Sequence, residues 1–170
     1  MGSFVRDRVI ERLLQDEGGE ANRPAAEDPG GRTRFGITVH RWLAEGGTLG
    51  GLETLTQAGA AQWWGDVVWD RMKLGRLKNE RLATVFLNLA GPLGEPRATL
   101  CLQQALNRLS PKPTIVEDGV LGSATVEKAN AYLHPAALVF VLKVEAARYL
   151  QSRPHWQYNG AGWSKRLDSL

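Results

Sequence analysis

The sequence predicts a mainly α-helical fold: a helical bundle around one central buried helix, with a small β-hairpin or loop region near residues 20–38. Three observations lead to this prediction. Apolar residues recur at three- and four-residue spacing along most of the 170-residue chain. Residues 82–89 are apolar on nearly every side, as expected of a helix enclosed by others. Between residues 20 and 36 this pattern stops, and Gly, Pro, Asn and Asp accumulate.

The helices can be placed in order from this spacing. A first helix carries the stripe Val5, Val9, Ile10, Leu13 and Leu14 and stops at Gly18-Gly19. Thr38 is expected to be the N-cap of a second helix, which ends where Gly46, Gly47, Gly50 and Gly51 break the pattern. Further helices are expected over residues 55–69, 82–89, 98–109, 124–133 and 135–151. The tail, residues 153–170, is aromatic and basic, and we assign no element to it.

The composition fits a folded soluble chain, with 43% hydrophobic and 23% charged residues. A formal net charge of +3 favours partners that carry carboxylates or phosphates, such as a bacterial cell wall. No stretch is basic enough to make nucleic acid the leading partner. The single cysteine, Cys101, cannot form an internal disulfide, and its apolar neighbours predict a small buried hydrophobic residue.

The N-terminal residues mix charged with apolar side chains and lack the apolar core of a signal peptide. The longest apolar run, residues 135–142, is far shorter than the ~20 residues that a membrane span needs. We therefore expect synthesis in the cytoplasm and no stable membrane insertion. Action outside the inner membrane then requires another component for release.

A carboxyl group falls on the inward face at the end of the first helix. At about 100° per residue from Val5, the apolar stripe centres near ~90° and Glu17 lies near ~120°. Burial raises the pKa of a carboxyl group, and a glycosidase needs a glutamic acid still protonated near neutral pH to protonate the leaving oxygen. The pattern alone leaves two alternatives open: a frayed helix with Glu17 in solvent, or pairing with a nearby arginine.

Two groups of residues resemble a known family. The first is similar to the signature of glycoside hydrolase family 108, the N-acetylmuramidases of phages, prophages and some secretion loci; it comprises Glu17-Gly18-Gly19 and then Asp28-Pro29-Gly30-Gly31-Arg32-Thr33-Arg34-Phe35-Gly36-Ile37-Thr38. The second resembles the peptidoglycan-binding segment that usually follows in this family; it comprises Asn88, Gly91, Leu102-Gln103, Asp118-Gly119, Gly122, Thr125, Gly162-Trp163 and Arg166.

The resemblance implies an α+β, lysozyme-like fold with a catalytic region over residues 1–90. A helical peptidoglycan-binding segment, residues 91–170, would pack against it in one compact, monomeric unit. The implied reaction is hydrolysis of the β-1,4 bond between N-acetylmuramic acid and N-acetylglucosamine in peptidoglycan, without a cofactor. Such an enzyme serves as an endolysin in phage lysis, where a holin-like partner lets it through the inner membrane, or opens the wall for secretion.

The resemblance also assigns catalytic roles. It implies that Glu17 is the essential catalytic residue. Glycoside hydrolysis usually needs a second group as well. Asp28 and Thr33 are the candidates, because they are similar to the Asp and Thr that position the attacking water in phage-type lysozymes. Each has a structural alternative, since Asp28 before Pro-Gly-Gly is a typical turn residue and Thr33 can pair across a hairpin.

Three further residues are candidates for substrate binding. Thr38 is one, although an N-cap role explains it better. Trp69 could stack on a sugar ring or pack in the core. Asn88 shares a polar stripe with Thr84, and this stripe either faces a cleft or meets a buried polar partner.

Two other classes of function remain as alternatives. The chain could be a non-catalytic peptidoglycan-binding module, or a helical nucleic-acid binder, which salt-dependent DNA binding would reveal. Metal chemistry is not expected, because His40, His134 and His155 are scattered and no Cys/His cluster has the spacing of a metal site.

Overall fold

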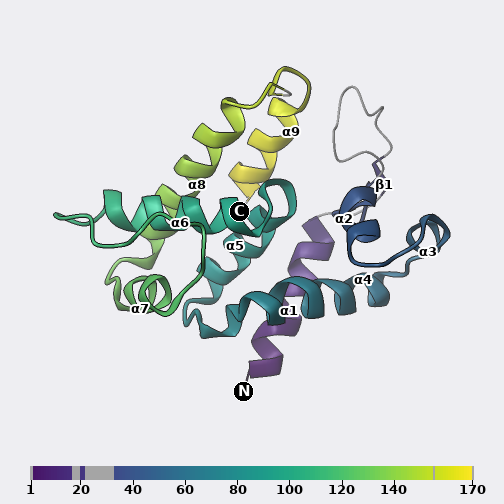
Figure 1. Cartoon of the computed structure of the whole chain (residues 1–170), viewed down its shortest axis with the longest axis horizontal. Coiled ribbons are helices and arrows are strands. Elements are labelled where there is room, and N and C mark those ends of the chain that lie inside the picture. The colour runs from purple at the N-terminus through teal and green to yellow at the C-terminus, as the bar shows by residue number, and fades with distance from the viewer. Residues whose placement is uncertain (1, 17–19, 22–32, 155, 170) are drawn as a thin grey trace.

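The computed structural model describes residues 2–16, 20–21, 33–154 and 156–169 (Figure 1). The α-helices are α1 (Gly2–Asp16), α2 (Val39–Ala44), α3 (Leu49–Glu53), α4 (Gln57–Trp63), α5 (Glu80–Leu93), α6 (Glu95–Arg108), α7 (Ser123–Ala131), α8 (Pro135–Gln151) and α9 (Trp156–Ser169). A π-helix, η1 (Trp64–Asp70), continues α4, and a short 3-10 helix, η2 (Leu74–Arg76), follows. Three short strands, β1 (Glu20–Ala21), β2 (Thr33–Arg34) and β3 (Ile37–Thr38), form an antiparallel sheet in that order. The predicted mainly α fold with a small β region is confirmed.

Helix α5 is the centre of the molecule, as the sequence predicts. Nine consecutive residues, from Leu82 to Ala90, are buried. The helix packs against α1, α6, α8 and η1 (Figure 1). Burying one large aliphatic or aromatic side chain contributes about 1.5–3 kcal/mol. The run of buried residues along α5 is therefore a principal source of the core's stability. The Asn79 side chain caps the helix by accepting a hydrogen bond from the Leu82 N–H at 2.8 Å.

Helix α1 follows the predicted stripe. Val9, Ile10, Leu13 and Leu14 are each at most 4% exposed, whereas Asp7 and Glu11 on the other side are exposed. The stripe faces α5, α4 and η1. The angular register that the sequence predicts for this helix is thus confirmed along its described length.

The second half of the chain is built on α6, α8 and α9. Helix α8 begins at Pro135, as predicted, since proline suits the first turn of a helix. Its buried Glu145 accepts a hydrogen bond from Arg108 Nε of α6 at 2.5 Å and pairs with Arg148 at 3.3 Å. The tail, to which the sequence assigns no element, forms α9 and packs against α8 (Figure 1).

The glycine-rich stretch after α2 contains a helix that the sequence analysis does not predict. Thr48 caps α3 by accepting a hydrogen bond from the Gly51 N–H at 3.1 Å, so Gly50 and Gly51 are helical rather than helix-breaking. Trp42 Nε1 also donates to the Thr48 carbonyl at 2.8 Å. A side chain on Gly47 would lie 2.2 Å from the Trp42 ring. Gly47 is therefore required by close packing.

The chain between α6 and α7 is held in place by two amide side chains that lie one turn apart on α6. Gln103 Nε2 donates to Asp118 Oδ1 at 2.8 Å, and its Oε1 accepts from the Gly119 N–H at 2.9 Å. Asn107 Nδ2 donates to the Ile115 carbonyl at 2.8 Å, and its Oδ1 accepts from the Ile115 N–H at 3.0 Å. The Asp118-Gly119 motif thus has the loop-building role that its Gly and Asp composition suggests.

Cys101 lies on α6 and is fully buried, as predicted. Burial raises the pKa of its thiol to about 11. None of the described helices has the length and apolarity that a membrane crossing requires.

Replacing Gln103 by Leu should destabilise the protein by about 1–3 kcal/mol, because the Asp118 carboxylate, the half-buried Gly119 N–H and the Val120 carbonyl all lose their side-chain partner. The hydrogen bond from Gln103 is the main reason that the pKa of the Asp118 carboxyl lies below its ordinary value. Since the folded pKa is the lower one, this contribution to stability is present above the unfolded pKa and is lost as pH falls through the folded pKa. NMR titration should therefore show the Asp118 pKa rising in Gln103→Leu.

The matched control is Gln104→Leu, which changes the neighbouring, half-buried glutamine. We expect Gln104→Leu to leave the Asp118 titration unchanged. An unaltered Asp118 pKa in Gln103→Leu would contradict the assignment of this contact.

Candidate active site

The hairpin formed by β2 and β3 brings two of the predicted site residues together. Thr33 lies opposite Thr38, and Arg34 lies opposite Ile37. Ala21 of β1 pairs with Thr33 on the other side. Because directly opposed residues project to the same face of a sheet, the two threonine side chains are neighbours. Thr38 also caps α2, with its Oγ1 accepting from the Arg41 N–H at 3.3 Å.

The hairpin turn is strained and held from outside. Both of its central residues have positive φ, 50° at Phe35 and 73° at Gly36, as a two-residue type I′ turn requires. Glycine adopts this region freely, but a left-handed phenylalanine costs about 1–2 kcal/mol. Trp64 Nε1 donates to the Phe35 carbonyl at 3.0 Å. The indole thus fixes the turn against η1.

A half-buried arginine joins the hairpin to the helical body. Arg41 of α2 lies with its guanidinium 5.3 Å from the Trp63 ring centroid and 5.5 Å from that of Trp64. Its Nη1 donates to the Ala90 carbonyl at 3.1 Å, and its Nη2 forms an ion pair with Glu95. Burial lowers the pKa of Arg41 from its ordinary value, an effect opposed by the nearby Glu45 carboxylate. The guanidinium is therefore enclosed by two aromatic rings and carries compensating acceptors.

The acceptors of Arg41 lie where α5 ends and α6 begins. Pro92 lies inside the last turn of α5, and Gly94 has a φ of 77° that turns the chain. Glu95 opens α6, where a negative charge also favours the helix dipole. Arg41 of α2 thus contacts both the end of α5, at Ala90, and the start of α6, at Glu95.

Asn88 lies deep in the same region of α5. It is 1% exposed, and its Nδ2 donates to the Thr84 carbonyl of its own helix at 3.0 Å. Thr84 likewise bonds the Glu80 carbonyl at 2.9 Å. Among the described residues, none donates a hydrogen bond to Asn88 Oδ1. A buried acceptor without a donor lowers the stability of the fold. The Asn88 Oδ1 atom can still accept a hydrogen bond from a polar group that reaches it.

Trp69 of η1 is 4% exposed and belongs to the hydrophobic core. This position accords with the core-packing alternative for Trp69, and its contact with substrate stays a prediction. The substrate-binding roles of Thr38 and Asn88 also stay predictions, as does the role of Thr33 in catalysis. Glu17 and Asp28 lie outside the described residues; in the sequence, Glu17 stands between the end of α1 and the start of β1.

No local sequence pattern singles out Arg41, Trp63 or Trp64. The contacts of Arg41 join residues up to 54 positions apart in the sequence, so they leave no local pattern. The signals in the sequence are the pair of adjacent tryptophans and an arginine within a mostly apolar helix. Within the described ranges, no group of three or more His, Cys, Asp or Glu side chains gathers in a way that could hold a metal ion.

Comparison with solved structures shows a close relation in fold. The structure of Brucella abortus SagA superposes with a TM-score of 0.81 at 22% sequence identity, covering 98% of this chain and 91% of that chain. A search of curated proteins finds no match.

Comparison with protein families shows which family the chain belongs to. The family described as Glycosyl hydrolase 108 matches residues 10–94, which contain the hairpin, Arg41 and all of α5. The matched segment spans half of the 170 residues. The chain therefore belongs to glycosyl hydrolase family 108, and it is an N-acetylmuramidase, a glycoside hydrolase that acts on peptidoglycan.

Proposed function

We propose that the protein hydrolyses the β-1,4 bond between N-acetylmuramic acid and N-acetylglucosamine, with Glu17 as the general acid. The protonated carboxyl of Glu17 donates its proton to the glycosidic oxygen while the bond to the anomeric carbon breaks. Water attacks that carbon and loses a proton, which yields a new reducing end on N-acetylmuramic acid. Asp28 and Thr33 position the attacking water.

The observation that carries this proposal is the register of α1. The buried side chains of Val9, Ile10, Leu13 and Leu14 have the periodicity from which the sequence analysis places Glu17 on the inward face. A carboxyl group in partly apolar surroundings has a raised pKa and keeps its proton near neutral pH. Membership of a glycoside hydrolase family supports the same role.

The position of Thr33 supports its part in the proposal. The strand that contains Thr33 pairs with β1, which follows Glu17 in the sequence by three positions. Thr33 lies on one face with Thr38, so two hydroxyl groups lie side by side on that face of the sheet. Hydroxyls and a carboxylate are suited to hold a water molecule by accepting and donating hydrogen bonds. Thr38, Trp69 and Asn88 are the proposed substrate contacts.

In its biological role, we infer that the enzyme lyses bacterial cells as a monomer. It is made in the cytoplasm and reaches the cell wall with the help of a holin-like partner. Local wall opening during secretion requires the same chemistry and is the second candidate. The C-terminal helices, residues 91–170, bind peptidoglycan beside the catalytic region. A non-catalytic binding module is the opposing hypothesis, and the experiment below separates it from an enzyme.

Glu17→Gln should reduce peptidoglycan hydrolysis by roughly 10²–10⁴-fold, because an amide cannot donate the proton that the leaving oxygen needs. The measurement is mass spectrometry of digested peptidoglycan together with the rate at which reducing ends appear. The wild-type protein should release muropeptides with new N-acetylmuramic acid ends. Glu127→Gln, the same change at an exposed position on α7, should keep full activity.

Two results would contradict this prediction. Equal rates for the wild-type protein and Glu17→Gln would exclude Glu17 as the acid. Reducing N-acetylglucosamine ends, or freed peptides, would exclude cleavage after N-acetylmuramic acid.

Arg41→Lys should lower both stability and the hydrolysis rate. Lysine keeps the charge but cannot bond Ala90 and Glu95 with a planar fork, nor place a flat guanidinium over the Trp63 and Trp64 rings. We expect a loss of about 1–2 kcal/mol in the free energy of unfolding and a lower kcat. Arg12→Lys, an exposed change on α1, is the control. Unchanged thermal unfolding and kcat in Arg41→Lys would show that the hairpin does not depend on this contact.

A further inference from the structure

Trp64 connects three segments that are far apart in the sequence. Its Nε1 donates to the Phe35 carbonyl in the β2–β3 turn at 3.0 Å, and its ring centroid lies 5.5 Å from the Arg41 guanidinium of α2. On α5, a Cβ added at Gly91 would lie 3.5 Å from Trp64 Cη2. The indole is 1% exposed and therefore too enclosed to touch a substrate. Any effect of Trp64 on catalysis must pass through the residues that it contacts.

Trp64 is also the first residue of η1, the π-helix that continues α4. Turns of π-helix are rare, occur mostly as short insertions in α-helices, and are frequent at functional sites. Because the hydrogen bonds of a π-helix span one residue more than those of an α-helix, the change at Trp64 alters the directions of the side chains. The chain thus leaves α-helical geometry at the residue that binds the hairpin.

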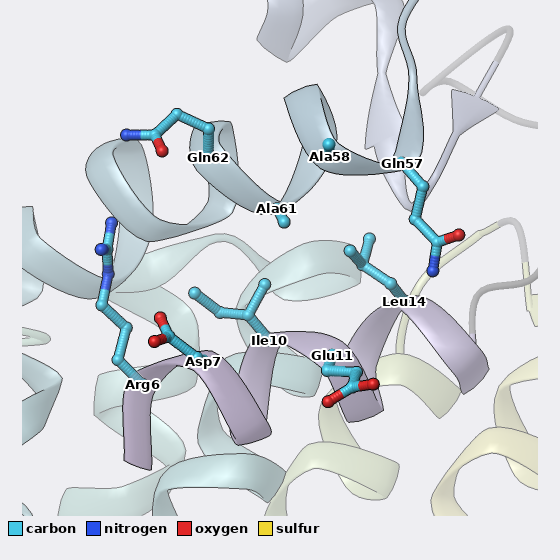
Figure 2. A pocket seen from close by; sticks show the side chains of 9 residues that line it. All are labelled: Arg6, Asp7, Ile10, Glu11, Leu14, Gln57, Ala58, Ala61 and Gln62. Atoms are coloured by element: carbon cyan, nitrogen blue, oxygen red, sulfur yellow. The ribbon is translucent and has the colours of Figure 1, made fainter. Parts of the chain in front are cut away.

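The junction of α4 and η1 is braced by a carboxylate. Asp66 of η1 accepts hydrogen bonds from Arg6 of α1 at 2.9 Å and from Gln62 of α4 at 2.7 Å. Figure 2 shows the Arg6 side chain extending from α1 toward the segment that contains Gln62. Gly65 allows this approach, because a Cβ there would clash with the Arg6 guanidinium. The residue that follows Trp64 is therefore held against α1, which limits where the indole can lie.

The turn that Trp64 binds is strained. Phe35 has a φ of 50°, an outlier for a bulky side chain, whereas asparagine or glycine is usual at this position of a type I′ turn. The strain of one left-handed residue and the net gain from one hydrogen bond are of similar size. The indole N–H therefore offsets the strain, and its loss would leave the turn free to relax.

A relaxed turn would displace both strands of the hairpin. Thr33 and Thr38 lie opposite each other, each two residues from a central residue of the turn. With connections this short, rotation at Phe35 moves both hydroxyl groups. A displacement of about 1 Å at a reacting group can lower a rate by roughly 100-fold. The orientation of the hairpin thus depends on the Trp64 hydrogen bond.

We propose that Trp64 is a positioning residue for peptidoglycan hydrolysis. Its indole N–H holds the strained turn at Phe35 and so sets the orientation of the hairpin in the active site. The inference rests on the proposed function in one respect, since it takes the hairpin face that carries Thr33 to be part of that site. It does not depend on which glycosidic bond is cleaved.

The first test is Trp64→Phe, which removes the N–H donor and keeps an aromatic ring in the core. With soluble peptidoglycan fragments, kcat for the release of reducing ends should fall roughly tenfold. KM should stay nearly unchanged, because the indole does not touch the substrate. The matched control is Trp42→Phe, which removes another indole–carbonyl bond, the one to Thr48 at 2.8 Å. It should lower the melting temperature and leave kcat unchanged. Equal kcat losses in the two variants would overturn the proposal.

A second change separates positioning from stability. Asn-Gly is strongly preferred at the centre of a type I′ turn, so such a turn needs no external donor. Adding Phe35→Asn to Trp64→Phe should therefore restore most of kcat, although the loss of the partly buried Phe35 ring lowers the melting temperature further. If kcat instead fell together with the melting temperature, Trp64 would have a structural role only.

Amide hydrogen exchange examines the turn without an activity assay. Exchange in residues 33–38 should become faster in Trp64→Phe but not in Trp42→Phe, because only the first change releases the Phe35 carbonyl. Unchanged exchange of these amides in Trp64→Phe would contradict the proposal.

The same assays separate this inference from the proposed function. If the wild-type protein released no N-acetylmuramic acid ends, the proposed function would fail, and the rate at which other reducing ends appear would still test Trp64. If Glu17→Gln were inactive while Trp64→Phe kept full activity, only the inference about Trp64 would fail.

Discussion

The guanidinium of Arg41 is the group on which the attachment of the hairpin depends. A charge enclosed by protein destabilises the fold unless acceptors surround it, and here those acceptors come from the junction of α5 and α6. In the structure this charge is satisfied with α2 against the two tryptophans and the hairpin beside it. A single side chain thereby ties residues 33–44 to the central helix.

The need for such a contact follows from how little apolar surface the hairpin region buries. Helix α2 contains no fully buried residue, and Ile37 is the one residue of the two preceding strands, β2 and β3, that is buried in the core. Polar contacts take the place of packing: Trp64 bonds the Phe35 carbonyl, and Arg34 Nε donates to the Leu55 carbonyl at 2.8 Å. Hydrogen bonds have strict directions, whereas apolar packing tolerates sliding. The hairpin is thus held in a defined orientation with a small core.

Much of the fold could be predicted from the sequence because the helices that carry the core have strong periodicity. The stripe on α1, the largely apolar residues 82–89 of α5 and the proline that begins α8 are local signals, and each predicted a helix correctly. Helix α9 could not be predicted in this way, since it contains Gly160 and Gly162 and owes its helical state to packing against α8. The short α3 was not predicted because it contains two glycines. The Thr48 N-cap stabilises this helix in spite of them. In the candidate site, the hairpin follows from turn residues, whereas the Arg41 contacts join distant segments and leave no local pattern.

Cys101 has a consequence for where the enzyme can work. The thiol of Cys101 lies on α6 and is buried in the hydrophobic core. Because its pKa is about 11, almost no thiolate is present at neutral pH. The sulfur is therefore unreactive toward oxidants and toward thiol exchange. Because the chain has a single cysteine, it cannot form an internal disulfide in an oxidising medium, and it contains none that a reducing medium could break. A protein with this chemistry keeps the same covalent structure when it passes from one redox environment to another.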